Sequence, residues 1–251
     1  SNFSLFRNRG VSGQLVSMHQ SGTHYLKHIV ACALAHRYGI SDPEFNHAND
    51  IFGGPRDSVV YPDLPRLISS HSWPNPAVML GGVRRFFELP PYVLLVRDIR
   101  FSLISNYAKW SHSYNVPFTT YLRGSTKSVK FNSDIWWAIR FLNGWGMIRK
   151  HAPLEIKIVK YEDLIDDPKK QINRLSEYWN LSLSSSDIEY GISQSSKSKM
   201  LLKDDPARPK GAVRKSNGHG LAIFTLDDRA YFEKTCCNYL RFPLGYDYST
   251  W

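Results

Sequence analysis

Leu15-Val16-Ser17-Met18 runs through His19-Gln20 into the turn Ser21-Gly22-Thr23, and this stretch decides the fold. The apolar run predicts a strand, and the turn leads into a helical pattern carried by Tyr25, Leu26, Ile29 and Val30. Backbone N–H groups in the first turn of a helix point outward, and the helix dipole favours negative charge there. Gly22 lets the backbone approach a phosphate or sulfonate closely, while Ser21 and Thr23 add hydroxyl donors. The turn is a candidate anion site, although taken alone it also fits an ordinary helix cap.

A second candidate anion site follows the apolar run Tyr92-Val93-Leu94-Leu95-Val96. Arg97 comes directly after this run, and Ser105 lies eight residues further on, about two helical turns away. If the chain turns sharply after Arg97, both side chains face the same phosphate. Two anion sites on one scaffold predict a ligand with two separated phosphate-like groups.

Strand and helix patterns alternate along the whole chain. Strands are predicted at residues 14–18, 67–70, 92–96 and 156–159, and helices at about 22–38, 101–108, 135–145, 168–179 and 226–240. Residues 42–65 are rich in Pro, Gly and Asn and are predicted to form a long loop. This alternation predicts a single α/β domain over residues 1–251, with a mostly parallel central sheet of four to five strands flanked by helices in three layers.

Four polar segments each follow a predicted strand: residues 21–23, His71, Arg97 and Tyr161. Ligands of parallel α/β sheets bind at the carboxyl ends of the strands. We therefore expect these four segments to meet at one edge of the sheet and to form one site.

The charge of the chain is strongly basic and unevenly spread. The formal net charge is +10, and residues 197–215 carry seven Lys or Arg against two Asp, which is half of it. This stretch fits either a solvated basic loop or a lid over an anionic ligand. Because the basic residues cluster there instead of forming a wide stripe, nucleic-acid binding is not predicted.

Cysteine usage and the chain ends bear on location. Three cysteines without a C-x-x-C pair favour a reduced compartment, and we expect a cytoplasmic protein. No apolar run reaches the roughly 18 residues of a membrane span, and no pattern predicts a metal site. The chain starts at Ser1-Asn2 without Met, so we expect trimming, and a leader or anchor upstream stays open.

Five segments, in order along about residues 14–225, resemble sulfotransferases that use 3′-phosphoadenosine 5′-phosphosulfate (PAPS). Residues 18–25 are similar to Y-P-K-S-G-T-T-W, residues 65–74 to P-R-x-x-K-T-H-x-P, and residues 97–105 to R-[ND]-P-x-D-x-x-x-S. Residues 161–172 match Y-E-D-L-x-x-D-P-x-x-x-I closely, and Arg214-Lys215-Ser216 is similar to the R-K-G loop. The resemblance implies a P-loop-NTPase-like sheet and a PAPS site, with adenosine 3′,5′-bisphosphate (PAP) as the product.

The resemblance also implies roles for individual residues. Ser21, Gly22, Thr23 and His24 would hold the 5′-phosphosulfate, whereas Arg97 and Ser105 would hold the 3′-phosphate and Arg214 and Lys215 would close over it. Tyr25 stands where the family has an adenine-stacking Trp, and Tyr161 would contact the edge of the base.

His71 is the candidate general base, because imidazole titrates near neutral pH and can take the proton of an attacking hydroxyl or amine. Without the resemblance, an ordinary loop histidine in an apolar setting is the favoured interpretation. Gln20 stands where the family has a Lys that neutralises charge on the leaving phosphate oxygen. Gln20 can donate a hydrogen bond there but carries no charge, so we expect weaker stabilisation.

Two other functions stay open. One is an ATP-dependent P-loop phosphotransferase, which the missing Lys of G-x-x-x-x-G-K-[ST] argues against. The other is a PAP- or polyanion-binding module without catalysis, which Gln20 favours. For a sulfotransferase we expect a small-molecule or carbohydrate acceptor, with a pocket lined by residues 42–65 and 114–131. The sequence carries no signal for the oligomeric state.

Overall fold

A parallel sheet of five strands forms the centre of the protein in a computed structural model, which describes residues 10–75, 89–127, 129–151, 156–207 and 220–251. The strands are β1 (Gly13–Ser17), β2 (Phe52–Gly53), β3 (Leu67–Ser70), β4 (Tyr92–Val96) and β5 (Ile156–Lys160). They lie in the order β2-β3-β1-β4-β5, and every pairing is parallel. The α/β class and the parallel sheet are therefore confirmed.

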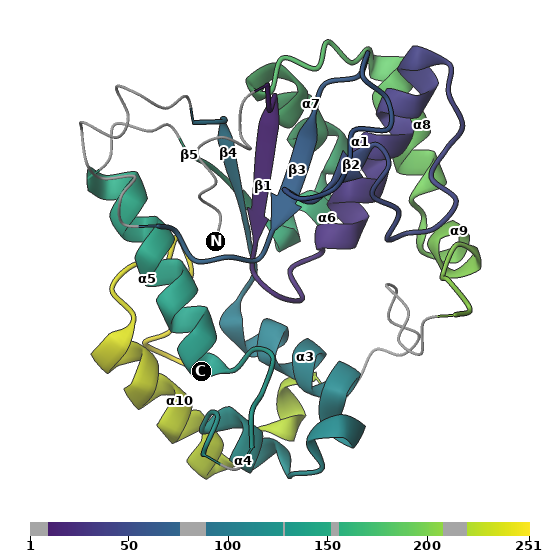
Figure 1. The fold of residues 1–251 in the computed structure, drawn as a ribbon. Coiled ribbons are helices and arrows are strands. Elements are labelled where there is room, and N and C mark those ends of the chain that lie inside the picture. The colour runs from purple at the N-terminus through teal and green to yellow at the C-terminus, as the bar shows by residue number, and fades with distance from the viewer. Residues whose placement is uncertain (1–9, 76–88, 128, 152–155, 208–219) are drawn as a thin grey trace.

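Helices cover both faces of this sheet (Figure 1). The helices α1 (Thr23–Tyr38), α7 (Pro168–Tyr178) and α8 (Ser185–Gln194) pack on one face. The helices α3 (Ile99–Tyr114), α5 (Ile135–His151) and α10 (Leu226–Tyr239) build the core on the other face. Shorter elements complete the described chain: α4 (Phe118–Leu122), α6 (Tyr161–Asp166), α9 (Lys197–Leu202) and η2 (Gly220–Ile223).

The neighbouring strands β1 and β4 are buried on both faces, which explains their mostly apolar sequences. Successive side chains alternate between the two cores: Leu15 joins α1 and α7 on one face, and Val16 joins α3 and α5 on the other. In β4, Val93 and Leu95 point to the first core and Leu94 to the second. The three layers predicted from the alternating pattern follow from this packing.

The predicted strands all form, and 67–70 and 92–96 have the predicted bounds. Residues 42–65 are mostly loop, as predicted, but Phe52 and Gly53 pair with Leu67 and Ile68 as the edge strand β2, which was not predicted. The helices α4, α6, α8 and α9 were not predicted. Each of the four has ten or fewer residues, too few to show a clear helical period.

Within the described residues, no helix is long and apolar enough to cross a membrane. The three cysteines are free, with Cys32 and Cys236 buried and Cys237 exposed.

Candidate functional site

The register of the sheet brings the four predicted segments to one edge. Val16 pairs with Ser70, so Ser17 and His71 come next to each other at the carboxyl ends of β1 and β3. Val96 pairs with Lys160, so Arg97 and Tyr161 come next at the ends of β4 and β5. The prediction that these segments meet at the carboxyl edge is confirmed.

The loop between β1 and α1 is shaped by two left-handed residues, Gln20 with φ 60° and Gly22 with φ 87°. The Ser21 hydroxyl donates to the Met18 carbonyl at 2.7 Å and so closes the loop on itself. The first backbone hydrogen bond of α1 runs from the Leu26 N–H to the Gly22 carbonyl, and no described side chain caps the helix. The N–H groups of the first turn are thus left to a ligand, whereas the Ser21 hydroxyl is already used.

Arg97 links the two predicted anion sites. Its Nη1 donates to the Gln20 carbonyl at 2.9 Å and to the Ser105 Oγ at 3.1 Å. The chain does turn sharply after Arg97, because Asp98 caps α3 by accepting the Arg100 N–H at 2.8 Å. The predicted approach of Arg97 and Ser105 is confirmed, and both lie beside the loop of the first anion site.

Two tyrosines border the same edge. The Arg97 guanidinium lies 4.3 Å from the centre of the Tyr161 ring, which also packs on Gly22. A Cβ at position 22 would lie 2.5 Å from Tyr161 Cδ2, so only glycine permits this contact. Burial raises the pKa of Tyr25, and the neighbouring Tyr161 raises it further. The two aromatic side chains expected to hold a base are therefore close together.

His71 is oriented by hydrogen bonds to the end of β1. Its Nδ1 lies 2.9 Å from the Ser17 carbonyl and 3.2 Å from the Ser17 Oγ, which in turn accepts from the Thr23 hydroxyl at 2.8 Å. Because a carbonyl can only accept, Nδ1 carries the proton and Nε2 is left as the basic nitrogen. Loss of solvation lowers the pKa of His71, and the Ser17 carbonyl partly opposes this. The His71 imidazole is thus held in one tautomer, which leaves Nε2 as its candidate basic nitrogen.

His19 is a site residue that sequence reasoning missed. Its ring stacks on His71 with centroids 4.3 Å apart at 24°, and its other neighbour is Trp137 of α5 at 4.5 Å. Burial and the nearby His71 and Lys109 lower the pKa of His19 to about 3. The available signal was a histidine beside Gln20, where the family pattern has proline.

His24 and Lys27, on the first turns of α1, face the segment that contains β2. His24 Nδ1 lies 3.3 Å from the Asn46 carbonyl, and burial lowers the pKa of His24 to about 4. Lys27 donates to Asn49 Oδ1 at 2.9 Å, and burial lowers its pKa to about 8. Since the His24 side chain is engaged with Asn46, its backbone N–H is the group that remains for an anion.

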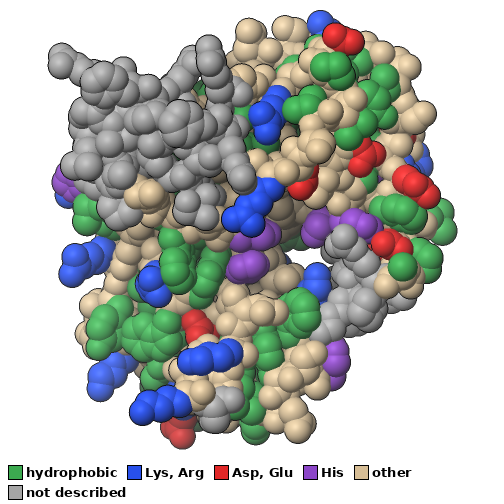
Figure 2. Space-filling view, viewed as in Figure 1, with side chains coloured by type: hydrophobic (Ala, Val, Ile, Leu, Met, Phe, Trp, Pro, Cys, Tyr) green, Lys and Arg blue, Asp and Glu red, His purple; other side chains and the backbone are tan. Residues whose placement is uncertain are grey.

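Figure 2 shows histidine side chains gathered in the hollow between the sheet and the helices beyond its carboxyl edge. The described residues contain no group of three or more His, Cys, Asp or Glu that could hold a metal ion. Arg214 and Lys215 lie outside the described residues.

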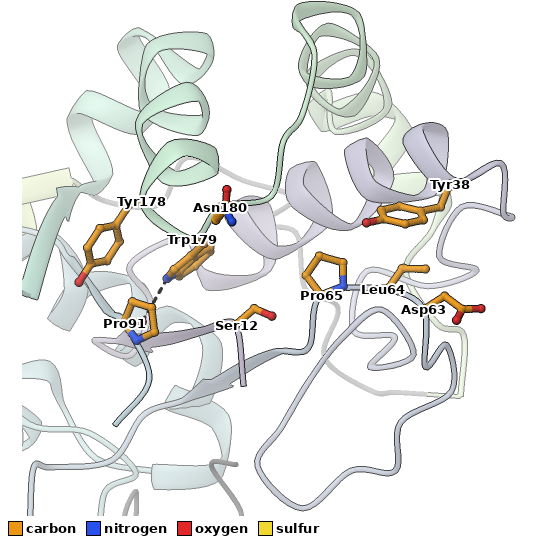
Figure 3. A pocket seen from close by; sticks show the side chains of 9 residues that line it. All are labelled: Ser12, Tyr38, Asp63, Leu64, Pro65, Pro91, Tyr178, Trp179 and Asn180. Atoms are coloured by element: carbon orange, nitrogen blue, oxygen red, sulfur yellow. Dashed lines mark hydrogen bonds between the residues drawn. The ribbon is translucent and has the colours of Figure 1, made fainter. Parts of the chain in front are cut away.

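A separate cavity of about 520 Å³ lies at the opposite edge of the sheet (Figure 3). Ser12, Pro65 and Pro91 line it just before β1, β3 and β4, together with Tyr38 at the end of α1 and Trp179 after α7. It is remote from His71 and Arg97 and holds neither anion site, so it is not the candidate active site.

Comparisons with known proteins agree with this geometry. Residues 14–220 match the sequence model of the sulfotransferase domain. Mouse sulfotransferase SULT7A1 complexed with PAP has a similar structure, with a TM-score of 0.60 at 16% identity over 93% of this chain and 84% of that one. Retinol dehydratase in complex with androsterone and PAP follows, with a TM-score of 0.58 at 16% identity over 94% of this chain and 82% of that one. A retinol dehydratase complex with retinol and PAP has a TM-score of 0.56 at 13% identity over 94% and 83%. No curated protein matches the chain significantly.

Proposed function

The chain belongs to the sulfotransferase family, and from this premise we propose that it moves a sulfuryl group from PAPS to a hydroxyl or amine of an acceptor and releases PAP. The observation that carries the proposal is the double contact of Arg97 with Gln20 and Ser105. One guanidinium joins two candidate sites for anions, which would suit a nucleotide with a phosphosulfate at one end and a phosphate at the other.

The residues at the carboxyl edge fit such a nucleotide. The N–H groups of the first turn of α1 would bind the 5′-phosphosulfate, with Gly22 allowing close approach. Arg97 and Ser105 would bind the 3′-phosphate, because a guanidinium has five N–H donors and can keep its bond to Gln20. Tyr25 and Tyr161 would bind the base. PAP in the similar solved structures supports this choice of cosubstrate.

His71 would act as the general base at Nε2. PAPS supplies the sulfuryl group when bound. As the acceptor oxygen bonds to sulfur, its proton passes to Nε2, and the electron pair of the breaking S–O bond goes to the phosphate of PAP. The hydrogen bond from Nδ1 to the Ser17 carbonyl stabilises the imidazolium that forms. Gln20 would stabilise the charge that develops on the leaving phosphate oxygen by donating its amide N–H to that oxygen.

The acceptor is proposed to be a small molecule or carbohydrate with a free hydroxyl or amine. The retinol dehydratase structures hold androsterone and retinol, which are small molecules. A location in the cytoplasm and a single domain over the whole chain stay predictions.

A PAP-binding module without transfer is the second candidate, and Gln20 favours it, since a neutral amide stabilises developing charge less than the family Lys. An ATP-dependent phosphotransferase has no comparable support.

Calorimetric titration with PAP and with ATP, followed by an assay with labelled PAPS and a panel of phenols, steroids and sugars, tests these functions. We expect PAP to bind much more tightly than ATP, and labelled sulfate to appear on an acceptor. Arg97→Ala should weaken PAP binding, while Arg174→Ala on the exposed side of α7 serves as the control. PAP binding without transfer to any acceptor would favour the binding module, and tighter binding of ATP would overturn the proposal.

A further inference from the structure

Three aromatic rings lie in contact next to the Ser17 carbonyl, with the His19 ring stacked on His71 and tilted against Trp137. His19 lies between His71, at 4.3 Å and 24°, and Trp137, at 4.5 Å and 55°. Trp137 is itself stacked on Phe141 at 5.0 Å and 20°. Since Trp137 and Phe141 belong to α5, these ring contacts connect the two histidines to a helix of the core that contains α3 and α10.

The backbone of His19 is held as well. The Ser102 hydroxyl of α3 donates to the His19 carbonyl at 2.7 Å, and Ser102 is buried. The next residue, Gln20, is fixed through its carbonyl by Arg97. The position of the His19 ring is therefore set by α3, α5 and the end of β4.

His71 needs such a partner. Its hydrogen bonds to described residues reach one edge of the ring, at Nδ1, and do not fix the tilt of the ring about that edge. A flat ring against one face removes this freedom, because offset stacking favours one relative plane. The basic Nε2 then keeps one direction.

We propose that His19 is a positioning residue for His71, whose stacked ring fixes the plane of the imidazole so that Nε2 points at the acceptor. This inference rests on the proposed role of His71 as the general base.

The charges around the pair suit this role. The charged groups that lower the pKa of His71 or His19 are Lys27 of α1 and Lys109 of α3, while the nearby His24 of α1 is uncharged near pH 7. Asp50 and Asp57 act on Lys27, one step further away. A proton on either ring of the pair meets these positive charges, so both imidazoles stay neutral near pH 7. His19 thus presents an uncharged face to His71 and adds no further positive charge beside it.

The first test compares His19→Ala with His19→Phe, which keeps a flat ring. His19→Ala should lower kcat about tenfold, because the energy of one aromatic pair corresponds to up to about that factor in rate. His19→Phe should keep most of the wild-type kcat. The KM for PAPS should stay within about twofold, because the loop that would hold PAPS keeps its contacts. His19→Ala uncovers one face of the His71 ring and reduces the burial that lowers its pKa, so the acidic limb of the pH profile should move to higher pH. His36→Ala is the matched control, since it removes a histidine stacked on Tyr190, 4.5 Å away, outside the site.

The second test needs no acceptor. Nuclear magnetic resonance titration of the His71 imidazole should show a higher pKa in His19→Ala than in the wild type and in His19→Phe. Urea unfolding reports whether each variant is folded, and His19→Gln replaces the alanine variant if that one is not. An unchanged His71 titration in the alanine or glutamine variant, or a phenylalanine variant as deficient as alanine, would overturn the positioning role. If the wild type transfers no sulfate but the His71 pKa still rises in His19→Ala, the result would count against the proposed enzyme activity alone.

Discussion

Arg97 Nη1 and Ser105 Oγ lie 3.1 Å apart, so the end of β4 is bonded to the second turn of α3. The same nitrogen reaches the Gln20 carbonyl at 2.9 Å. Arg97 therefore connects the two candidate anion sites through direct hydrogen bonds.

Arg97→Lys is expected to weaken PAP binding by about tenfold although it keeps the positive charge. Lysine is a point charge without the planar fork, so it cannot serve Gln20, Ser105 and a phosphate together. Ser105→Ala removes one neutral partner and should cost less, about 1 kcal/mol of binding free energy. Calorimetry with PAP measures both, and equal affinity of Arg97→Lys and wild type would contradict the assignment of the 3′-phosphate to Arg97.

Gly22→Ala should lower the free energy of unfolding by about 2–3 kcal/mol, since the new Cβ adds a collision to backbone strain. The collision is with the Tyr161 ring, 2.5 Å away, and the strain comes from φ 87°. Gly39→Ala is the matched control, because Gly39 also has a positive φ, 66°, but a Cβ at this position would meet no atom of another described residue outside its own helix turn within 4 Å. Urea unfolding compares them, and equal losses would mean that Tyr161 does not press on the loop.

Gln20→Lys is expected to raise kcat by about tenfold, because a cation stabilises developing charge on the leaving oxygen better than an amide does. The backbone contact of Gln20 with Arg97 uses the carbonyl and survives the change. Gln20→Met, which has no donor, should lower kcat. Steady-state kinetics with PAPS decide this, and identical kcat values for all three proteins would remove residue 20 from catalysis.

The free energy of unfolding should fall as the pH drops below 6.5. His19 and His24 have folded pKa values of about 3 and about 4, below the ordinary value of 6.5 that they regain on unfolding. The unfolded chain then binds more protons, so the stabilising contribution is complete above pH 6.5 and is lost progressively toward pH 4.

His19→Phe removes one of these titrations, and its stability should depend less steeply on pH, by up to about 1.4 kcal/mol per pH unit. Urea unfolding between pH 7 and pH 5 measures the slope. A slope equal to that of the wild type would show that His19 is not protected from protonation.

Prediction from sequence worked where the signal was local. The bounds of β4 and the turn into α1 follow from the apolar period and Gly22, which lie within a few residues of each other. The approach of Arg97 to Ser105 also needed only one turn and one helix. The two-residue strand β2 could not be predicted, because it forms by pairing with Leu67 and Ile68 and has no pattern of its own.

The sequence by itself determined the alternating α/β architecture, the turn that is a candidate anion site and the residue types of a sulfotransferase, because these depend on periodicity and on the chemistry of single side chains. Only the tertiary structure decided that the Ser21 hydroxyl closes its own loop, that His71 carries its proton on Nδ1 and that His19 stacks on it. The physical reason is distance along the chain: His19, His71 and Trp137 come from three separate segments, and only the packing of α5 against the sheet brings their rings together.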